Sequence, residues 1–209
     1  MKMPLWMVAW VFVLEIVVIL IFIPGDWTRK VIAEERVLLQ SSLGIETVHW
    51  IEKKSNDWYQ TTIIDSGLYK TAFHVLVPTD EERNNSRGMA DMGDWWFVWV
   101  NSRIEALADV IYQFYTRTAL FLIWAPYMLI LLFPSIYDGL MNWRIKRSNF
   151  AYSSPVIHRY SVRFTFYLVT GLVIAFFAPI TLNPIIIPVV MMACCVLVGL
   201  TVSNFQKRV

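Results

Sequence analysis

The sequence has only two cysteines and lacks the short motifs that mark most enzyme classes. Cys194 and Cys195 are adjacent within an apolar block, with no histidine or acidic residue near them. A phosphate-binding GxxxxGK[ST] loop, a GxGxxG turn, an HExxH zinc motif, a GxSxG elbow and a CxxC pair are all missing. We therefore expect no disulfide, no metal site and no cofactor, and we predict that the protein is not an enzyme.

Apolar residues are abundant and are gathered into four blocks. They make up 57% of the 209 residues, against about 45–50% in a typical soluble domain, and the mean hydropathy is +0.51. This pattern predicts an all-α membrane protein with four transmembrane helices and a helical extracytoplasmic insertion between the first and the second. The predicted segments are an N-terminal anchor (1–25), a helical insertion (26–116), a second span (117–134), a basic loop (135–163) and a transmembrane hairpin with a short basic tail (164–209).

Charge is distributed unevenly along these segments. Between Asp26 and Thr116 the sequence has fourteen acidic and nine basic residues. The segments at the other side of the predicted spans have eight basic residues against Asp138 alone. Short loops rich in Lys and Arg stay in the cytoplasm. The sequence thus predicts a protein of the bacterial inner membrane with both termini in the cytoplasm, residues 26–116 in the periplasm and an N-terminal anchor that is not cleaved.

The spacing of apolar residues predicts helices in the insertion. One helical pattern begins near Asp26 and is weakened at Gly44, and a second stretch runs over 57–77. Asp94 is a suitable N-cap for a long helix that continues into the membrane, is bent at Pro126 and ends at Pro134, before a short linker over 135–139.

Two ionisable residues lie within or beside the predicted spans. Glu15 is near the middle of the first span, and Arg117 is at the outer end of the second. Side chains of a helix lean toward its N-terminus, which directs these two apart. We expect Arg117 to extend outward and Glu15 to be protonated or bonded to a hydroxyl such as that of Thr170, where it fixes helix packing. A small transporter is a further alternative, disfavoured because no second acid occurs in any predicted span.

Small residues recur every four positions in the last two predicted spans. Gly171 and Ala175 form one such pair, and Cys195 and Gly199 form another. This spacing lets helix backbones approach closely, so we predict a tight hairpin between the two spans.

The basic loop combines arginines with aromatic residues. Arginines that alternate with aromatics are typical of protein interfaces, which predicts partner-binding roles for a set of residues: Arg144, Arg147, Arg159, Trp143 and Tyr152. A loop that only sets topology and contacts anionic lipid headgroups is the simpler alternative. Five basic residues in the twenty from 144 to 163 are too few to predict direct nucleic-acid contact.

One pattern in and beside this loop resembles a known family. It consists of Tyr137-Asp138-Gly139, Arg144, Ser154-Pro155 and His158-Arg159. It is similar to an inner-membrane protein family of integrating conjugative elements and related plasmids, a domain of unknown function encoded beside the TraD-type coupling ATPase. The resemblance covers residues from about 94 to the C-terminus. It implies a role in conjugative DNA transfer, with the hexameric coupling ATPase as the partner, and it implies no catalytic residues.

The leading hypothesis is therefore an inner-membrane accessory component of a conjugative type IV secretion system, which binds the coupling ATPase in the lipid bilayer. The alternative is an entry-exclusion or other surface-recognition membrane protein, whose outer region contacts an incoming partner. Self-association is a further kind of contact that the sequence leaves open.

Overall fold

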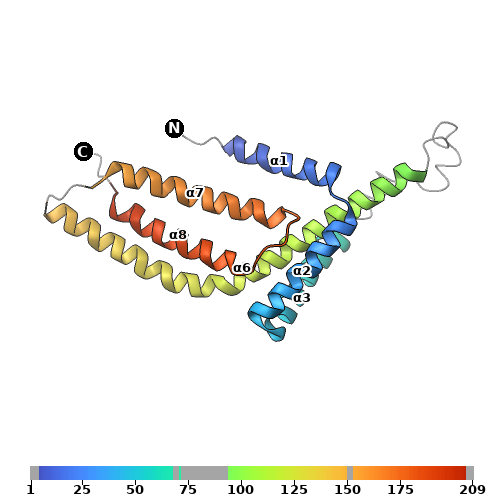
Figure 1. Ribbon diagram of the computed structural model, residues 1–209. Coiled ribbons are helices and arrows are strands. Elements are labelled where there is room, and N and C mark those ends of the chain that lie inside the picture. Colours follow the sequence, from blue (N-terminus) through green and yellow to red (C-terminus); the bar gives the residue numbers. More distant parts are fainter. Residues whose placement is uncertain (1–4, 68–70, 72–93, 150–152, 206–209) are drawn as a thin grey trace. The chain divides into compact units, whose positions relative to one another are not determined.

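The computed structural model describes residues 5–67, 71, 94–149 and 153–205, and these contain helices and no strand (Figure 1). The prediction of an all-α fold is confirmed for these residues. The elements are α1 (Leu5–Phe22), α2 (Gly25–Leu43), α3 (Ile45–Tyr59), the π-helical turn η1 (Gln60–Ile64), α6 (Asp94–Ser148), α7 (Pro155–Phe177) and α8 (Ile186–Ser203).

Two residues divide the first half of the chain into separate helices. Pro24 is extended, with φ −78° and ψ 153°, and the axes of α1 and α2 differ by 112° there. Gly44 has φ +82°, a left-handed value that other residues adopt at a cost, and it ends α2 and precedes α3. The interruption expected at Gly44 is thus a complete break between two helices.

Three helices are long and apolar enough to cross a membrane. They lie within Val98–Ser148, Pro155–Phe177 and Ile186–Ser203, and α1 with α2 makes a fourth if that bent pair is counted as one span. These helices indicate a membrane protein. The orientation of the spans and the periplasmic location of residues 26–116 stay predictions.

Helix α6 is longer than the sequence predicted. It continues through Pro126 and Pro134 to Ser148 and has 55 residues, about 80 Å at about 1.5 Å per residue. The linker expected over 135–139 is helical. Each proline removes one backbone hydrogen bond, but in apolar surroundings a full break would leave several unpaired backbone groups, which costs more.

The chain divides into two compact units, and α6 contributes to both. Unit 1 comprises Met1–Ala119 with Phe176–Asn183, and unit 2 comprises Leu120–Ala175 with Pro184–Val209. In unit 1, α2 runs parallel to the first part of α6, since Gly25 bonds to Ser102 and Thr28 to Asp109. Helix α3 returns antiparallel to α2, joined to it by the Arg36–Glu52 ion pair.

Buried apolar residues form the core of this three-helix bundle. Most of them are three, four or eight positions apart within a helix, which places them on one face. The residues are Val31 and Leu39 in α2, Val48 and Ile51 in α3, and Val100, Ile104, Ala106 and Val110 in α6.

In unit 2 the rest of α6 packs against α8, and α7 lies beside α8 (Figure 1). The hydrogen bonds from Ser135 to Cys195 O and from Trp143 to Phe205 O advance along both helices together. Helices α6 and α8 are therefore parallel, and their C-terminal ends lie at the same end of unit 2.

Candidate functional site

The most deeply buried charge of the described residues is Arg117, in α6. Its side chain has no exposed surface, and its partner Glu35, in α2, is 4% exposed. Arg117 Nε donates to Glu35 Oε1 at 2.9 Å, and a terminal nitrogen donates to Oε2 at 2.8 Å. This two-bond geometry satisfies both charges inside the bundle.

The remaining N–H groups of Arg117 face the chain that follows α7. They donate to the carbonyl oxygens of Ala178 at 2.8 Å, Phe176 at 3.4 Å and Ile180. Carbonyls at the end of a helix lack partners within the helix. Arg117 has five N–H donors in a planar fork, and five acceptors surround it. It therefore joins α2, α6 and the end of α7 within unit 1.

Glu35 also accepts a hydrogen bond from Gln113 Nε2 at 2.6 Å. The carboxylate thus has partners at both oxygens, all contributed by α6. The sequence predicts that Arg117 points outward, and it does not predict the pair with Glu35. A signal for it existed, because Glu35 lies on the same stripe of α2 as the buried Thr28, Val31 and Leu39.

Glu15, the other predicted intramembrane polar residue, lies in α1. Its Oε2 atom is buried and has no hydrogen-bond partner among the described residues. Its expected bond to a hydroxyl is not observed there. Its electrostatic neighbour is Arg117, so both predicted polar residues lie in the same region of unit 1.

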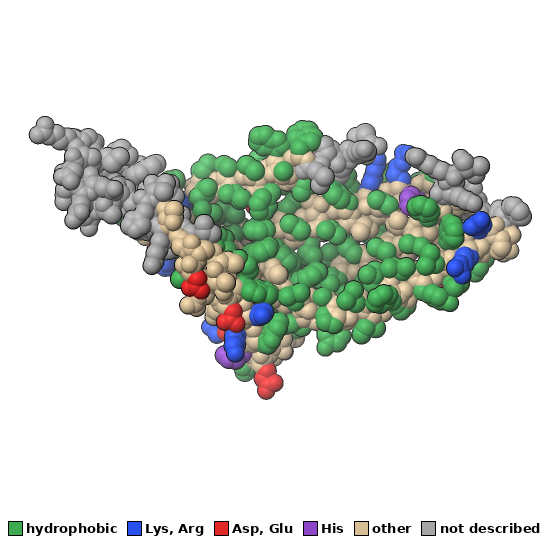
Figure 2. Space-filling model, turned by 180° about the vertical axis from the view of Figure 1, so that it is seen from behind, with side chains coloured by type: hydrophobic (Ala, Val, Ile, Leu, Met, Phe, Trp, Pro, Cys, Tyr) green, Lys and Arg blue, Asp and Glu red, His purple; other side chains and the backbone are tan. Residues whose placement is uncertain are grey.

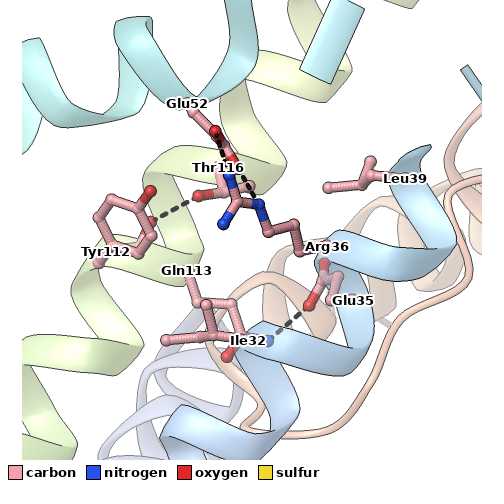
Figure 3. Close-up of a pocket in the computed structure, with 8 residues that line it drawn as sticks. All are labelled: Ile32, Glu35, Arg36, Leu39, Glu52, Tyr112, Gln113 and Thr116. Carbon is pink, nitrogen blue, oxygen red and sulfur yellow. Dashed lines mark hydrogen bonds and ion pairs between the residues drawn. The ribbon is translucent and has the colours of Figure 1, made fainter. Parts of the chain in front are cut away.

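A small cavity is lined in part by Glu35 and Gln113 (Figure 3). Its volume is about 120 Å³, which is large enough to hold water. The lining residues are Ile32, Glu35, Arg36, Leu39, Glu52, Tyr112, Gln113 and Thr116. Gln113 Oε1 is buried and has no partner among the described residues, so a bound water molecule can donate to it. Within the described part of the chain, no cluster of His, Cys, Asp or Glu could hold a metal ion.

The predicted small-residue positions have different neighbours in unit 2. A Cβ atom added to Gly199 would lie 2.5 Å from Ser135 Oγ and 2.9 Å from Ser135 O, and one added to Gly139 would lie 2.6 Å from Gly199 O. Cys195 accepts a hydrogen bond at its carbonyl oxygen from Ser135 Oγ at 2.6 Å. A Cβ added to Gly171 would meet nothing within 4 Å.

The closest backbone approach thus joins α8 to α6, whereas the sequence prediction placed it between α7 and α8. Ser135 and Gly139, four positions apart in α6, face the small residues of α8. The three atoms nearest to a Cβ added to Gly199 all belong to Ser135 of α6, whereas Ala175 lies in α7.

Basic residues gather at the end of unit 2 where α6 ends and α7 begins (Figure 2). Arg144, Arg147 and Arg159 are exposed. Lys146 is turned to the end of α8, where its Nζ atom lies 3.2 Å from Ser203 Oγ and 3.0 Å from Asn204 Oδ1. The three arginines are therefore available to a partner, and Lys146 instead stabilises the C-terminus of α8.

The predicted partner-binding residues also include two aromatic side chains, Trp143 and Tyr152. Trp143 is half-buried, and its Nε1 donates to the carbonyl oxygen of Phe205 at 2.9 Å. Tyr152 lies outside the described residues. His158 also contacts the end of α8, with Nδ1 3.0 Å from Thr201 O. Residues of α6 and α7 thus hold the C-terminal end of α8 from two sides.

Comparison with known families gives a match over most of the chain. A family model described as IncC plasmid conjugative DNA transfer protein DtrJ-like matches residues 24–207. The match includes both units and almost the whole chain. Searches of curated proteins and of solved structures gave no match.

Proposed function

We propose that this chain is an inner-membrane accessory component of the type IV secretion system. The chain belongs to the DtrJ-like family of IncC plasmid conjugative DNA transfer proteins. In the proposed role it binds the coupling ATPase that delivers DNA to the transfer channel. Family membership supports the conjugative role, and the apolar helices support the membrane location.

The observation that carries the ATPase-binding part of the proposal is the exposed set of Arg144, Arg147 and Arg159. These side chains lie at the ends of two membrane-length helices. In the proposed orientation a partner with a cytoplasmic domain can reach them. Arginine is enriched at the energetic centres of interfaces. A loop that only sets topology requires positive charge but no particular side chain.

Topology is the first part of the proposal to test. We replace Cys194 and Cys195 with alanine and introduce a single cysteine at Ser42, in α2, or at Ser148, at the end of α6. A membrane-impermeant maleimide applied to intact spheroplasts should label Ser42→Cys and leave Ser148→Cys unlabelled until the cells are opened. Labelling of Ser148→Cys alone in intact spheroplasts would reverse the proposed orientation.

The docking role is tested by replacing Arg144, Arg147 and Arg159 together with lysine. Lysine retains the charge, so insertion and attraction to headgroups should persist, but the planar five-donor fork is lost. We expect recovery of the coupling ATPase in affinity purification and the frequency of DNA transfer each to fall at least about tenfold, the change that a binding free energy weaker by about 1.4 kcal/mol makes in Kd.

The matched control is Lys146→Arg, at the same end of α6, because Lys146 contacts α8 rather than the exterior. It should retain ATPase recovery. If the triple lysine variant recovers the ATPase and transfers DNA at the parental level, these arginines act only as a charge signal and the docking role is wrong.

A further inference from the structure

The basic end of unit 2 has an excess of positive charge that no ion pair among the described residues balances. The sequence has no acidic side chain after Asp138, although seven basic residues follow it. Asp138 itself accepts a hydrogen bond from Asn142 at Oδ2. No described residue forms an ion pair with Arg144, Arg147 or Arg159. A partner with negative charge would therefore complement this end of unit 2.

Arg147 is the arginine of this set that the structure holds in place. Its guanidinium carbon lies 5.6 Å from the centre of the Trp143 ring, within the range of a cation–π contact. The ring in turn is fixed by the hydrogen bond from Trp143 Nε1 to Phe205 O. A chain of contacts thus runs from the end of α8 through Trp143 to Arg147.

We propose that Arg147 is a carboxylate-binding site for an acidic segment of the coupling ATPase, with Trp143 as its positioning residue. This inference rests on the proposed function. A planar guanidinium binds a carboxylate through two parallel hydrogen bonds, for which its orientation matters. Stacking on Trp143 fixes that orientation before binding, which lowers the entropy lost on association. Attraction to a fluid layer of lipid headgroups depends on charge near the surface and needs no fixed orientation.

The test uses the full chain in nanodiscs of phosphatidylcholine, which has no net charge, with a fluorescent hexaglutamate peptide as the probe. Binding is followed by fluorescence anisotropy. Arg147→Lys should weaken binding about tenfold. Trp143→Leu should weaken it to a similar extent, because the ring that orients the guanidinium is gone. The control Lys146→Arg, at a basic residue of the same helix that contacts the end of α8, should weaken binding less than threefold.

The double variant separates positioning from general structural damage. If Trp143 acts through Arg147, Trp143→Leu should cause no further loss of affinity in the Arg147→Lys background. Additive losses would show that Trp143 has a separate structural role and would overturn its assignment. Each variant is also checked for an unchanged melting temperature.

Two results would overturn the carboxylate site. One is parental affinity of Arg147→Lys for hexaglutamate. The other is that Arg147→Lys loses affinity only for phosphatidylglycerol vesicles, which would assign the site to lipid phosphate.

The two proposals fail separately, because recovery of the ATPase in affinity purification tests the proposed function. An unaffected hexaglutamate affinity with lost ATPase recovery in the triple lysine variant would reject only the carboxylate site. Hexaglutamate binding without any ATPase recovery by the parental protein would reject the proposed function.

Discussion

Replacing Arg117 with alanine should destabilise unit 1 by about 3–5 kcal/mol, because it leaves the carboxylate of Glu35 buried without its cation. It also removes the donors that satisfy the carbonyl oxygens of Ala178 and Ile180. Arg117→Lys should recover only part of this loss, since lysine has three donors in place of the five of arginine. Chemical denaturation of the protein in detergent measures the change.

The control is Arg29→Ala. Arg29 forms an ion pair of similar length with Glu105, at 2.7 Å, but its side chain is 60% exposed. An exposed pair contributes about 0–1 kcal/mol, so this variant should remain close to the parental stability. A loss of less than about 1 kcal/mol for Arg117→Ala would contradict the stabilising role of the buried pair.

Gly199→Leu should disrupt the contact between α6 and α8, whereas Gly171→Leu should leave the protein nearly unchanged. The leucine at 199 would press against both the hydroxyl and the backbone of Ser135, which cannot move without displacing α6. Overpacking of this kind costs about 1–3 kcal/mol and sometimes more. A Cβ at 171 meets open space, and leucine is favourable in the bilayer.

Thermal unfolding in detergent compares the two variants. Gly139→Leu should behave like Gly199→Leu, because the added Cβ would meet the carbonyl oxygen of Gly199. Equal loss for Gly171→Leu and Gly199→Leu would instead support the hairpin contact that the sequence predicted between α7 and α8.

The sequence was informative where structure depends on local pattern. Helical spacing predicted the helices before and after Gly44, and composition predicted membrane-length helices in the second half of the chain. Small residues at spacing four predicted close helix contact involving Cys195 and Gly199. These features follow from neighbours three or four positions apart, which a single sequence shows directly.

The partners across the fold were not predictable in the same way. Glu35 and Arg117 are 82 positions apart, and nothing in the spacing of charges joins them. Helix α8 contacts α6 rather than its sequence neighbour α7 at the glycine position, because Ser135 and Gly139 present a matching small surface. The sequence predicts a linker at Ser135 and Gly139, because Pro134 is expected to end the helix. Because α6 in fact continues through Pro134, these two residues lie on the face of α6 that contacts α8.

The most direct test of the account is site-specific photo-crosslinking in conjugating cells. A photoreactive amino acid is placed at Arg144, at the basic end of unit 2, and in a second strain at His49, an exposed position of α3. The account predicts a covalent adduct with the coupling ATPase from position 144 and none from position 49. An adduct from position 49 alone, or the absence of an ATPase adduct from position 144 while DNA transfer continues, would contradict docking of the ATPase at the basic end.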